Sequence, residues 1–490
     1  MKSTFLFAAM LLLTAPPSFA QGHLSLSDAI GRALAQNPAI RAAQAATGEA
    51  SQRITQARAG YLPRLELVES AQRGNQPVFA FSSLLAERRF SAADFAIGSL
   101  NHPDAVTNLH TGLAVEQPIF DGFRARAATR AAEIGQTLAV TGQEQVRADL
   151  ALAATRAYAL VLAAVADRRA ARAAVQAAEE DQKRAEHRRD AGLASEADVL
   201  ALQVHVAQMR ERFIRASSDE TVRRAELNQA IGEPLDRFFA LDDVQPDTIP
   251  APPADQLEQQ ALAARPEVRT ARLQEGLARE DRRTARAAFL PQISFQGFFD
   301  LNGSGEAFSA HASAWMVGAQ ARWTIFSGLA DVARLREAGL AGDRVAADRE
   351  RIETAVRLEV RTAAAQIQSA TARQQVGLAE VAQARESQRI IRDRYEAGLA
   401  SVSDVLRAAD AVLEAESRHT AATVDLLVSN AMLDRAVGRV PAGRREVVLT
   451  VRKSECPAVR RSDFRGSTSS PRPEPVEGRT PGPPDSRTTE

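Results

Sequence analysis

The chain has 490 residues, of which 45% are hydrophobic and only 5% are aromatic. Its 61 Lys and Arg residues balance 61 Asp and Glu residues, so it lacks the basic excess of nucleic-acid-binding proteins, and we expect no nucleic-acid partner. One cysteine, Cys456, excludes an intramolecular disulfide and a cysteine-based zinc cluster. The common phosphate-binding, metal-binding and serine-nucleophile motifs do not occur, so we predict no enzymatic activity, no metal site and no cofactor.

The N-terminal segment, residues 1–20, is predicted to be a cleaved export signal. Lys2 supplies a positive charge, residues 5–13 form a short apolar run, and small residues precede a cut between Ala20 and Gln21. A membrane anchor fits less well, because a helical span needs roughly 20 apolar residues. We expect no transmembrane helix further along the chain, so a membrane-embedded form would have to be a barrel.

The two halves of the chain match each other over long distances. Residues up to Pro63 match at an offset of 228, whereas residues from Phe120 onward match at an offset of 206, which leaves 228 − 206 = 22 extra residues in the first half. Constant offsets over such lengths predict a duplicated structural unit. The matched segments are 37–41 with 265–269, 57–63 with 285–291, 119–122 with 325–328, and 191–200 with 397–406. The predicted parts are repeat 1 (21–232), a Pro- and Asp-rich connector (233–253), repeat 2 (254–438) and a disordered tail (439–490).

Each repeat is predicted to open with helices. Ser27 suits the N-cap of the first helix, and Pro38 suits the start of the next. Pro63 and Pro291 end these opening helices, which span 26–60 in repeat 1 and 255–289 in repeat 2.

A β-hairpin follows in each repeat, over 62–118 and 291–324. Apolar residues such as Phe295 and Val317 alternate with polar or small residues, a period of two that is typical of strands with one apolar face. Such strands suit a membrane barrel with its apolar face toward lipid, although an ordinary soluble hairpin shows the same alternation. Membrane barrels begin at eight strands. Because each chain offers four, two copies would give eight and three would give twelve.

A very long helix and a returning helix complete each repeat, over 122–232 and 328–438. Gly192 and Gly398 break the long helices, and Ser195 and Ser401 are expected to cap the returning ones. Each long helix would extend about 100 Å, which is unlike a globular domain. A soluble antiparallel coiled coil would explain these helices equally well.

The order, duplication and spacing of these elements resemble TolC-family outer membrane efflux proteins. The resemblance rests on the Ala-Gly-Leu-Ala-Ser-x-x-Asp-Val-Leu elements at 191–200 and 397–406, the Leu-Pro strand entries, and the Phe-x-Gly returns. It covers about 24–438. It implies a mainly α-helical fold with a small β part, in which two tandem repeats build a coiled-coil barrel. It also implies a homotrimer whose chains each give four strands to a shared 12-stranded β-barrel.

The resemblance further implies a function and a location. The chain would be the outer membrane channel, or exit duct, of a tripartite efflux or type I secretion system in a Gram-negative cell. Its expected partners are a periplasmic adaptor (membrane fusion) protein, an inner-membrane pump of the RND or ABC type, and outer membrane lipid. The alternative from the residues alone is a soluble periplasmic coiled-coil adaptor or scaffold protein.

The resemblance also assigns three residues near the periplasmic tip. Asp404 matches a position whose three copies form an acidic ring in the pore, and such rings favour cations. Asp198 and Tyr395 match a gating latch, whose expected arginine falls at Ala400, so Arg394 is a candidate substitute. The alternative is that both aspartates cap their helices, since acids in a first turn favour the helix dipole.

Overall fold

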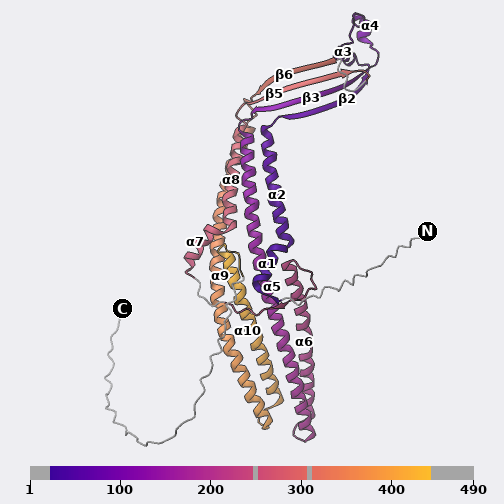
Figure 1. The fold of residues 1–490 in the computed structure, drawn as a ribbon. Coiled ribbons are helices and arrows are strands. Elements are labelled where there is room, and N and C mark those ends of the chain that lie inside the picture. The colour runs from indigo at the N-terminus through magenta and orange to yellow at the C-terminus, as the bar shows by residue number, and fades with distance from the viewer. Residues whose placement is uncertain (1–22, 247–251, 306–311, 443–490) are drawn as a thin grey trace, which may run out of the picture. The chain divides into compact units, whose positions relative to one another are not determined.

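The computed structural model describes residues 23–246, 252–305 and 312–442 (Figure 1). The predicted export signal (1–20) and nearly all of the predicted tail (439–490), with Cys456, lie outside the described residues. What is described is mainly α-helical with a small β part, as the sequence predicted.

The opening helices of repeat 1 each begin after a residue that caps the N-terminus of the helix. Ser25 caps α1 (Leu26–Gln36), because its hydroxyl accepts a hydrogen bond from the backbone N–H of Asp28 at 3.1 Å. The prediction of Ser27 as the cap was therefore wrong, since Ser27 already lies inside the helix. Asn37 caps α2 (Pro38–Arg58), and a 3₁₀ turn, η1 (Ala59–Tyr61), follows. The corresponding helices of repeat 2 are α7 (Ala254–Ala264) and α8 (Pro266–Ala287).

Two helical hairpins account for most of the chain (Figure 1). The long helices are α5 (Arg124–Asp190) and α9 (Ala330–Glu396), and the returning helices are α6 (Glu196–Ile231) and α10 (Val402–Ala436). Each long helix has 67 residues, and a helix of that size is about 100 Å long. Helix α5 packs along α6, α9 packs along α10, and α10 also contacts α5, which brings the two hairpins together.

One described helix, α5, is long and apolar enough by composition to cross a membrane, although the sequence was expected to hold no such stretch. The stretch is rich in alanine, and several of its residues, among them Ala154, Tyr158 and Val161, are fully buried within this chain. They pack with α1 and α6 in a shared core. Packing against other helices therefore accounts for the apolar character of this stretch.

Each repeat has its own apolar core at the base of its opening helices. In repeat 1 the hydroxyl of Tyr158 lies 2.9 Å from the carbonyl oxygen of Leu24 and 2.7 Å from that of Asp242. It thereby ties α5 to a small parallel sheet of β1 (His23–Leu24) and β4 (Ala240–Leu241), which the sequence did not predict. In repeat 2, residues of α7 to α10 such as Val268 and Val360 form the equivalent core.

The second sheet joins the two repeats. Its strands are β2 (Arg64–Gly74), β3 (Val106–Phe120), β5 (Gln292–Gly303) and β6 (Ser313–Arg322). They are antiparallel in the order β2-β3-β5-β6, so β3 of repeat 1 pairs with β5 of repeat 2. The connection from β2 to β3 holds short helices that the sequence did not predict, namely α3 (Pro77–Ala86), η2 (Ala92–Phe95) and α4 (Ile97–Asn101).

Candidate channel gate and membrane surface

The strand register divides the four-stranded sheet into an apolar face and a polar face. Leu67 of β2 lies opposite Leu113 of β3, which lies opposite Phe299 of β5, which lies opposite Trp315 of β6. Directly paired residues share a face, so one apolar side chain from each strand lines up across this face. The other members of the apolar face include Leu65, Leu109, Val115, Phe295, Leu301 and Val317.

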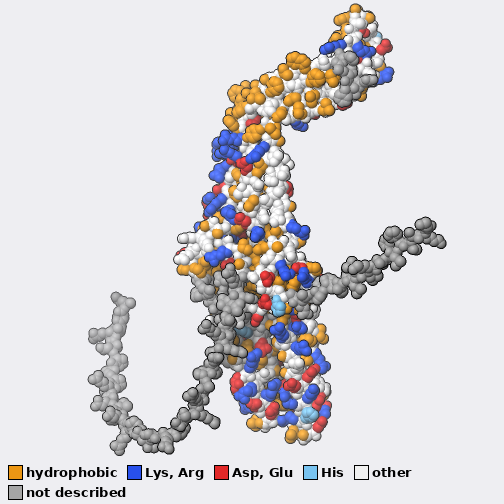
Figure 2. All heavy atoms as spheres, in the orientation of Figure 1, with side chains coloured by type: hydrophobic (Ala, Val, Ile, Leu, Met, Phe, Trp, Pro, Cys, Tyr) orange, Lys and Arg blue, Asp and Glu red, His pale blue; other side chains and the backbone are white. Residues whose placement is uncertain are grey.

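The opposite face is mostly polar, although Val68, Phe298 and Met316 also lie on it. Its members include Arg64, Glu66, Ser70, Asn108, His110, Glu116, Gln296, Asp300, Asn302, Gln320 and Arg322. Figure 2 shows hydrophobic side chains gathered over the strands, where a soluble protein would expose polar ones. Trp315 is 75% exposed and Leu67 is 65% exposed, so the described part of this single chain leaves them largely uncovered. An uncovered apolar face opposite a polar face is the pattern of a lipid-facing barrel wall.

Both edges of this sheet are open within the described residues, because β2 and β6 each pair on one side only. Unpaired edge strands expose backbone N–H and C=O groups that pair readily with another strand. A barrel removes such edges by closing on itself. Four strands are too few for that closure, so the edges predict pairing between copies.

The two hairpin tips share the same local structure, in which a glycine follows the long helix and a serine caps the returning helix. Gly192 and Gly398 have positive φ angles of 74° and 75°, in the left-handed region that favours glycine at a helix end. Ser195 and Ser401 then cap α6 and α10, as the sequence predicted, each in a reciprocal capping box with the acid three residues on.

Asp404, the predicted ring residue, is the acid of the second capping box. Its Oδ2 accepts hydrogen bonds from the backbone N–H of Ser401 at 3.0 Å and from its hydroxyl at 2.7 Å. Its Oδ1 accepts one from Arg407 at 2.7 Å. The hydrogen bonds from Ser401, supported by the charge of Arg407, hold the pKa of Asp404 below its ordinary value. Asp404 is therefore a capping residue and also a stable negative charge at the tip.

Asp198 and Tyr395, the predicted latch, are close but not bonded to each other in this chain. Asp198 accepts hydrogen bonds from the N–H and hydroxyl of Ser195, at 3.1 and 2.8 Å. The hydroxyl of Tyr395 is buried and has no hydrogen-bond partner among the described residues. Its pKa is raised, mainly by burial, and the charge of Asp198 adds to that shift. Within the described chain no hydrogen bond or ion pair joins Arg394 to Asp198.

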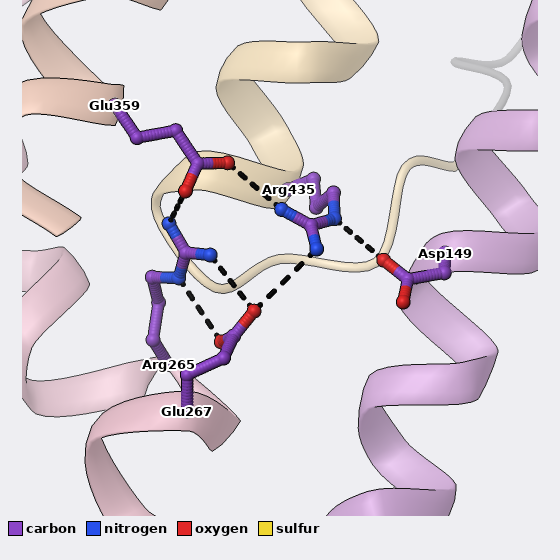
Figure 3. Close-up of polar contacts among 5 residues, drawn as sticks. All are labelled: Asp149, Arg265, Glu267, Glu359 and Arg435. Atoms are coloured by element: carbon purple, nitrogen blue, oxygen red, sulfur yellow. Dashed lines mark hydrogen bonds and ion pairs between the residues drawn. The ribbon is translucent and has the colours of Figure 1, made fainter. Parts of the chain in front are cut away.

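A cluster of five charged residues joins helices α8, α9 and α10 of repeat 2 to α5 (Figure 3). Arg265 is 3% exposed and pairs with Glu267 at 2.8 Å and with Glu359. Arg435 pairs with Glu359 at 2.8 Å and with Asp149 of α5. Burial alone would lower the pKa of Arg265, but the hydrogen bonds that Arg265 donates to Glu267 and Glu359 outweigh burial, and the pKa is raised. Every member of this cluster therefore has an ion-pair partner within it.

Local sequence patterns missed this cluster because its members are far apart in the chain. The repeat alignment could have found it, since repeat 1 has neutral residues at the matching positions. At the offsets of 228 and 206 the counterparts of Arg265, Glu267, Glu359 and Arg435 are Asn37, Ala39, Ala153 and Gln229. The described residues hold no group of three or more His, Cys, Asp or Glu placed to bind a metal ion.

Comparison with known proteins supports the interpretation of the sheet as part of an outer membrane protein. A sequence profile described as outer membrane efflux protein matches residues 29–233 and 257–439. The chain is similar to the solved structure of a membrane protein from Pseudomonas aeruginosa, with 21% identity, a TM-score of 0.72, and 84% of this chain and 93% of that chain covered. It is also similar to VceC of Vibrio cholerae (19% identity, TM-score 0.69, coverage 84% and 96%) and to the CmeC outer membrane channel of Campylobacter jejuni (16%, 0.70, 86% and 87%). No curated protein matches the chain.

The family profile covers well over half of the residues, so the chain belongs to the outer membrane efflux protein family. The predictions of the family, the fold class, efflux through the outer membrane and an outer membrane location are thereby confirmed. Members of this family transport substrates and are not enzymes. Nothing in these comparisons favours a soluble adaptor.

Proposed function

We propose that three copies of this chain close a 12-stranded β-barrel in the outer membrane, continued by a tunnel of their long helices into the periplasm. The observation that carries the proposal is the four-stranded sheet, apolar on one face, polar on the other and open at both edges. Eight strands from two copies would also close a barrel, but small eight-stranded barrels are filled by side chains. Twelve strands leave a wider lumen, which suits an exit duct.

The proposed duct is passive and works with partners that supply the free energy. A periplasmic adaptor and an inner-membrane pump of the RND or ABC type would dock at the helical tips, and export would remove residues 1–20. Opening would be an iris-like shift of the hairpins, a two-state change biased by docking. Asp404 would contribute three carboxylates to a ring in the closed tip, and Asp198 and Tyr395 would help to hold the tip shut.

Planar bilayer recording on the purified mature protein tests this function. We expect discrete conductance steps from a detergent-soluble trimer, whose mass is measured by native mass spectrometry. An adaptor would dissolve without detergent, show little β signal by circular dichroism and form no pores. A dimeric pore would support a duct and exclude the 12-stranded barrel.

A further inference from the structure

The helix ends next to the four-stranded sheet are rich in arginine. Helices α2 and α8 end just before β2 and β5, and α5 and α9 begin soon after β3 and β6. The seven helical residues nearest the strands are 52–58, 124–130, 281–287 and 330–336. Together they hold ten arginines and two acidic residues, although the whole chain has no net charge. These ten residues, here named the arginine collar, are Arg53, Arg58, Arg124, Arg126, Arg130, Arg282, Arg283, Arg286, Arg334 and Arg336.

The far ends of the long helices show that this excess of arginine is local. There the last seven residues of α5 and α9 and the first seven of α6 and α10 hold six arginines and seven acidic residues. Arg124 and Arg126 moreover lie in the first turn of α5, where the helix dipole disfavours a positive charge. Helix formation therefore does not explain the collar.

The duplication keeps arginine at two pairs of matching positions in the collar. Arg58 matches Arg286 at the offset of 228, and Arg130 matches Arg336 at the offset of 206. Within the described chain α2 packs on α5, α5 on α8, and α8 on α9, so the four helices lie side by side. Each repeat thus supplies an arginine before its first strand and another after its second, which spreads the charge across all four helices.

Most arginines of the collar lack a carboxylate partner in this chain. Arg58 pairs with Glu133 at 3.4 Å and Arg334 pairs with Asp331 at 3.0 Å, and Arg53 and Arg283 also have partners on their own helices. Three copies of the chain would bring 3 × 6 = 18 unpaired charges around one barrel. Among the described residues the side chains of six form no ion pair, and all but the half-buried Arg130 are exposed: Arg124, Arg126, Arg130, Arg282, Arg286 and Arg336.

The collar lies at the depth where a bilayer has its headgroups. Seven helical residues rise about 10 Å, and the headgroup layer on one side of a bilayer is about 5–7 Å thick. In Figure 2, Lys and Arg side chains gather over the helices just below the strands, in the same view as the hydrophobic side chains of the sheet. Aromatic side chains mark the membrane–water interface of barrels, and five exposed ones lie between the strands and the collar: Tyr61, Phe123, Phe289, Trp323 and Phe326.

We propose that the arginine collar binds the phosphate groups of anionic phospholipids in the periplasmic leaflet of the outer membrane. The inference rests on the proposed function, since it assumes that the sheet is part of a barrel in this membrane. A guanidinium group donates two parallel hydrogen bonds to phosphate oxygens, and anionic lipid attracts each arginine near a membrane surface. The bound lipids would neutralise the unpaired charges and fix the depth of the channel in the membrane.

Native mass spectrometry of the purified mature protein, mixed with equal amounts of phosphatidylglycerol and phosphatidylethanolamine, tests the inference. The unchanged protein should retain the anionic phosphatidylglycerol in preference. Arg130→Gln with Arg336→Gln should lower the affinity for phosphatidylglycerol about fivefold for each arginine that contacts the lipid. Its affinity for phosphatidylethanolamine should stay nearly unchanged.

The matched control is Arg172→Gln with Arg357→Gln. It removes the same charge from the same two helices, at exposed positions that form no ion pair within the described chain. These positions lie about 60 Å and 30 Å further along α5 and α9, away from the headgroups. The control should bind both lipids like the unchanged protein, and an equal loss in the control would overturn the inference.

The other outcomes separate this inference from the function on which it rests. If the unchanged protein forms no pore, the proposed function is wrong. If it forms pores and shows no preference for phosphatidylglycerol, the inference is wrong and the function stands. A collar variant that keeps its lipids and changes the ion selectivity of the pore would place these arginines in the lumen, which also refutes the inference.

Two further measurements keep the test decisive should the glutamine variant fail to assemble. Arg130→Lys with Arg336→Lys keeps both charges and should keep the preference for phosphatidylglycerol. The unchanged protein, immobilised and washed, should lose phosphatidylglycerol between about 0.1 and about 1 M salt, because salt screens these exposed charges. Retention that does not depend on salt would contradict binding by the collar.

Discussion

Two neighbouring substitutions in β6 test which face of the sheet meets lipid. Val317 lies on the apolar face, opposite Gly297, and Met316 lies on the polar face, opposite Phe298. Their side chains are almost equally exposed in the single chain, at 58% and 62%. A protein surrounded by water would therefore tolerate arginine at both positions to a similar degree. A barrel in a bilayer would tolerate arginine less well at the position that faces lipid.

The expected cost follows from the position of Val317 in the middle of a 10-residue strand. Arginine on the lipid face of a barrel costs about 2–4 kcal/mol at the bilayer midplane and little in the lumen. Three copies of Val317→Arg would thus cost a trimer about 6–12 kcal/mol. Met316→Arg should leave stability nearly unchanged and shift the ion selectivity of the pore toward anions.

Folding of both variants into lipid vesicles, followed by tryptophan fluorescence over a urea titration, measures the difference. A change of gel mobility on heating gives a second measure of how much protein has folded into the barrel. Equal stability of Val317→Arg and Met316→Arg would refute the assignment of the lipid face. A larger cost for Met316→Arg would mean that the two faces are reversed.

Three further substitutions probe the tip and the charged cluster. Asp404→Ala should weaken both the cation selectivity of the pore and its block by multivalent cations. Because the pKa of Asp404 is lowered, the unchanged protein should keep its cation selectivity at mildly acidic pH. It should lose that selectivity only as the pH falls through the pKa of Asp404. Asp198→Ala should raise conductance if Asp198 is part of a latch, whereas an unchanged conductance with slightly lower stability would make it only a cap. Arg265→Ala should lower the free energy of unfolding by about 3 kcal/mol, because it leaves Glu267 and Glu359 without their buried partner, and an unchanged melting temperature by circular dichroism would contradict this.

Local and periodic features of the fold could be predicted from the sequence. The capping boxes begin with Ser195 and Ser401 and end three residues later, so the pattern and the contact lie in one helical turn. The alternation around Phe295 and Val317 likewise fixes which face of a strand is apolar. The short helix α3 was missed because its ten residues show no clear helical period.

Contacts between the two repeats could not be predicted in this way. The side chains of Arg188 and Tyr395 contact each other, although the two residues are 395 − 188 = 207 residues apart and no pattern near either points to the other. The charged cluster around Arg265 is a departure from the repeat, so only a comparison of the two halves at matching positions would indicate it. Such contacts depend on how two long hairpins lie against each other, and that arrangement follows from the packing of many small residues.

Cross-linking between the open edges of the sheet tests the shared barrel most directly. The double variant Val68→Cys on β2 and Met316→Cys on β6, in a Cys456→Ser background, is treated in detergent with a thiol linker that tolerates a register shift of a few residues. A shared 12-stranded barrel predicts covalent bands up to a trimer on a denaturing gel, with none from either single variant. Bands that end at a dimer, or no linked bands from a properly folded protein, would contradict it.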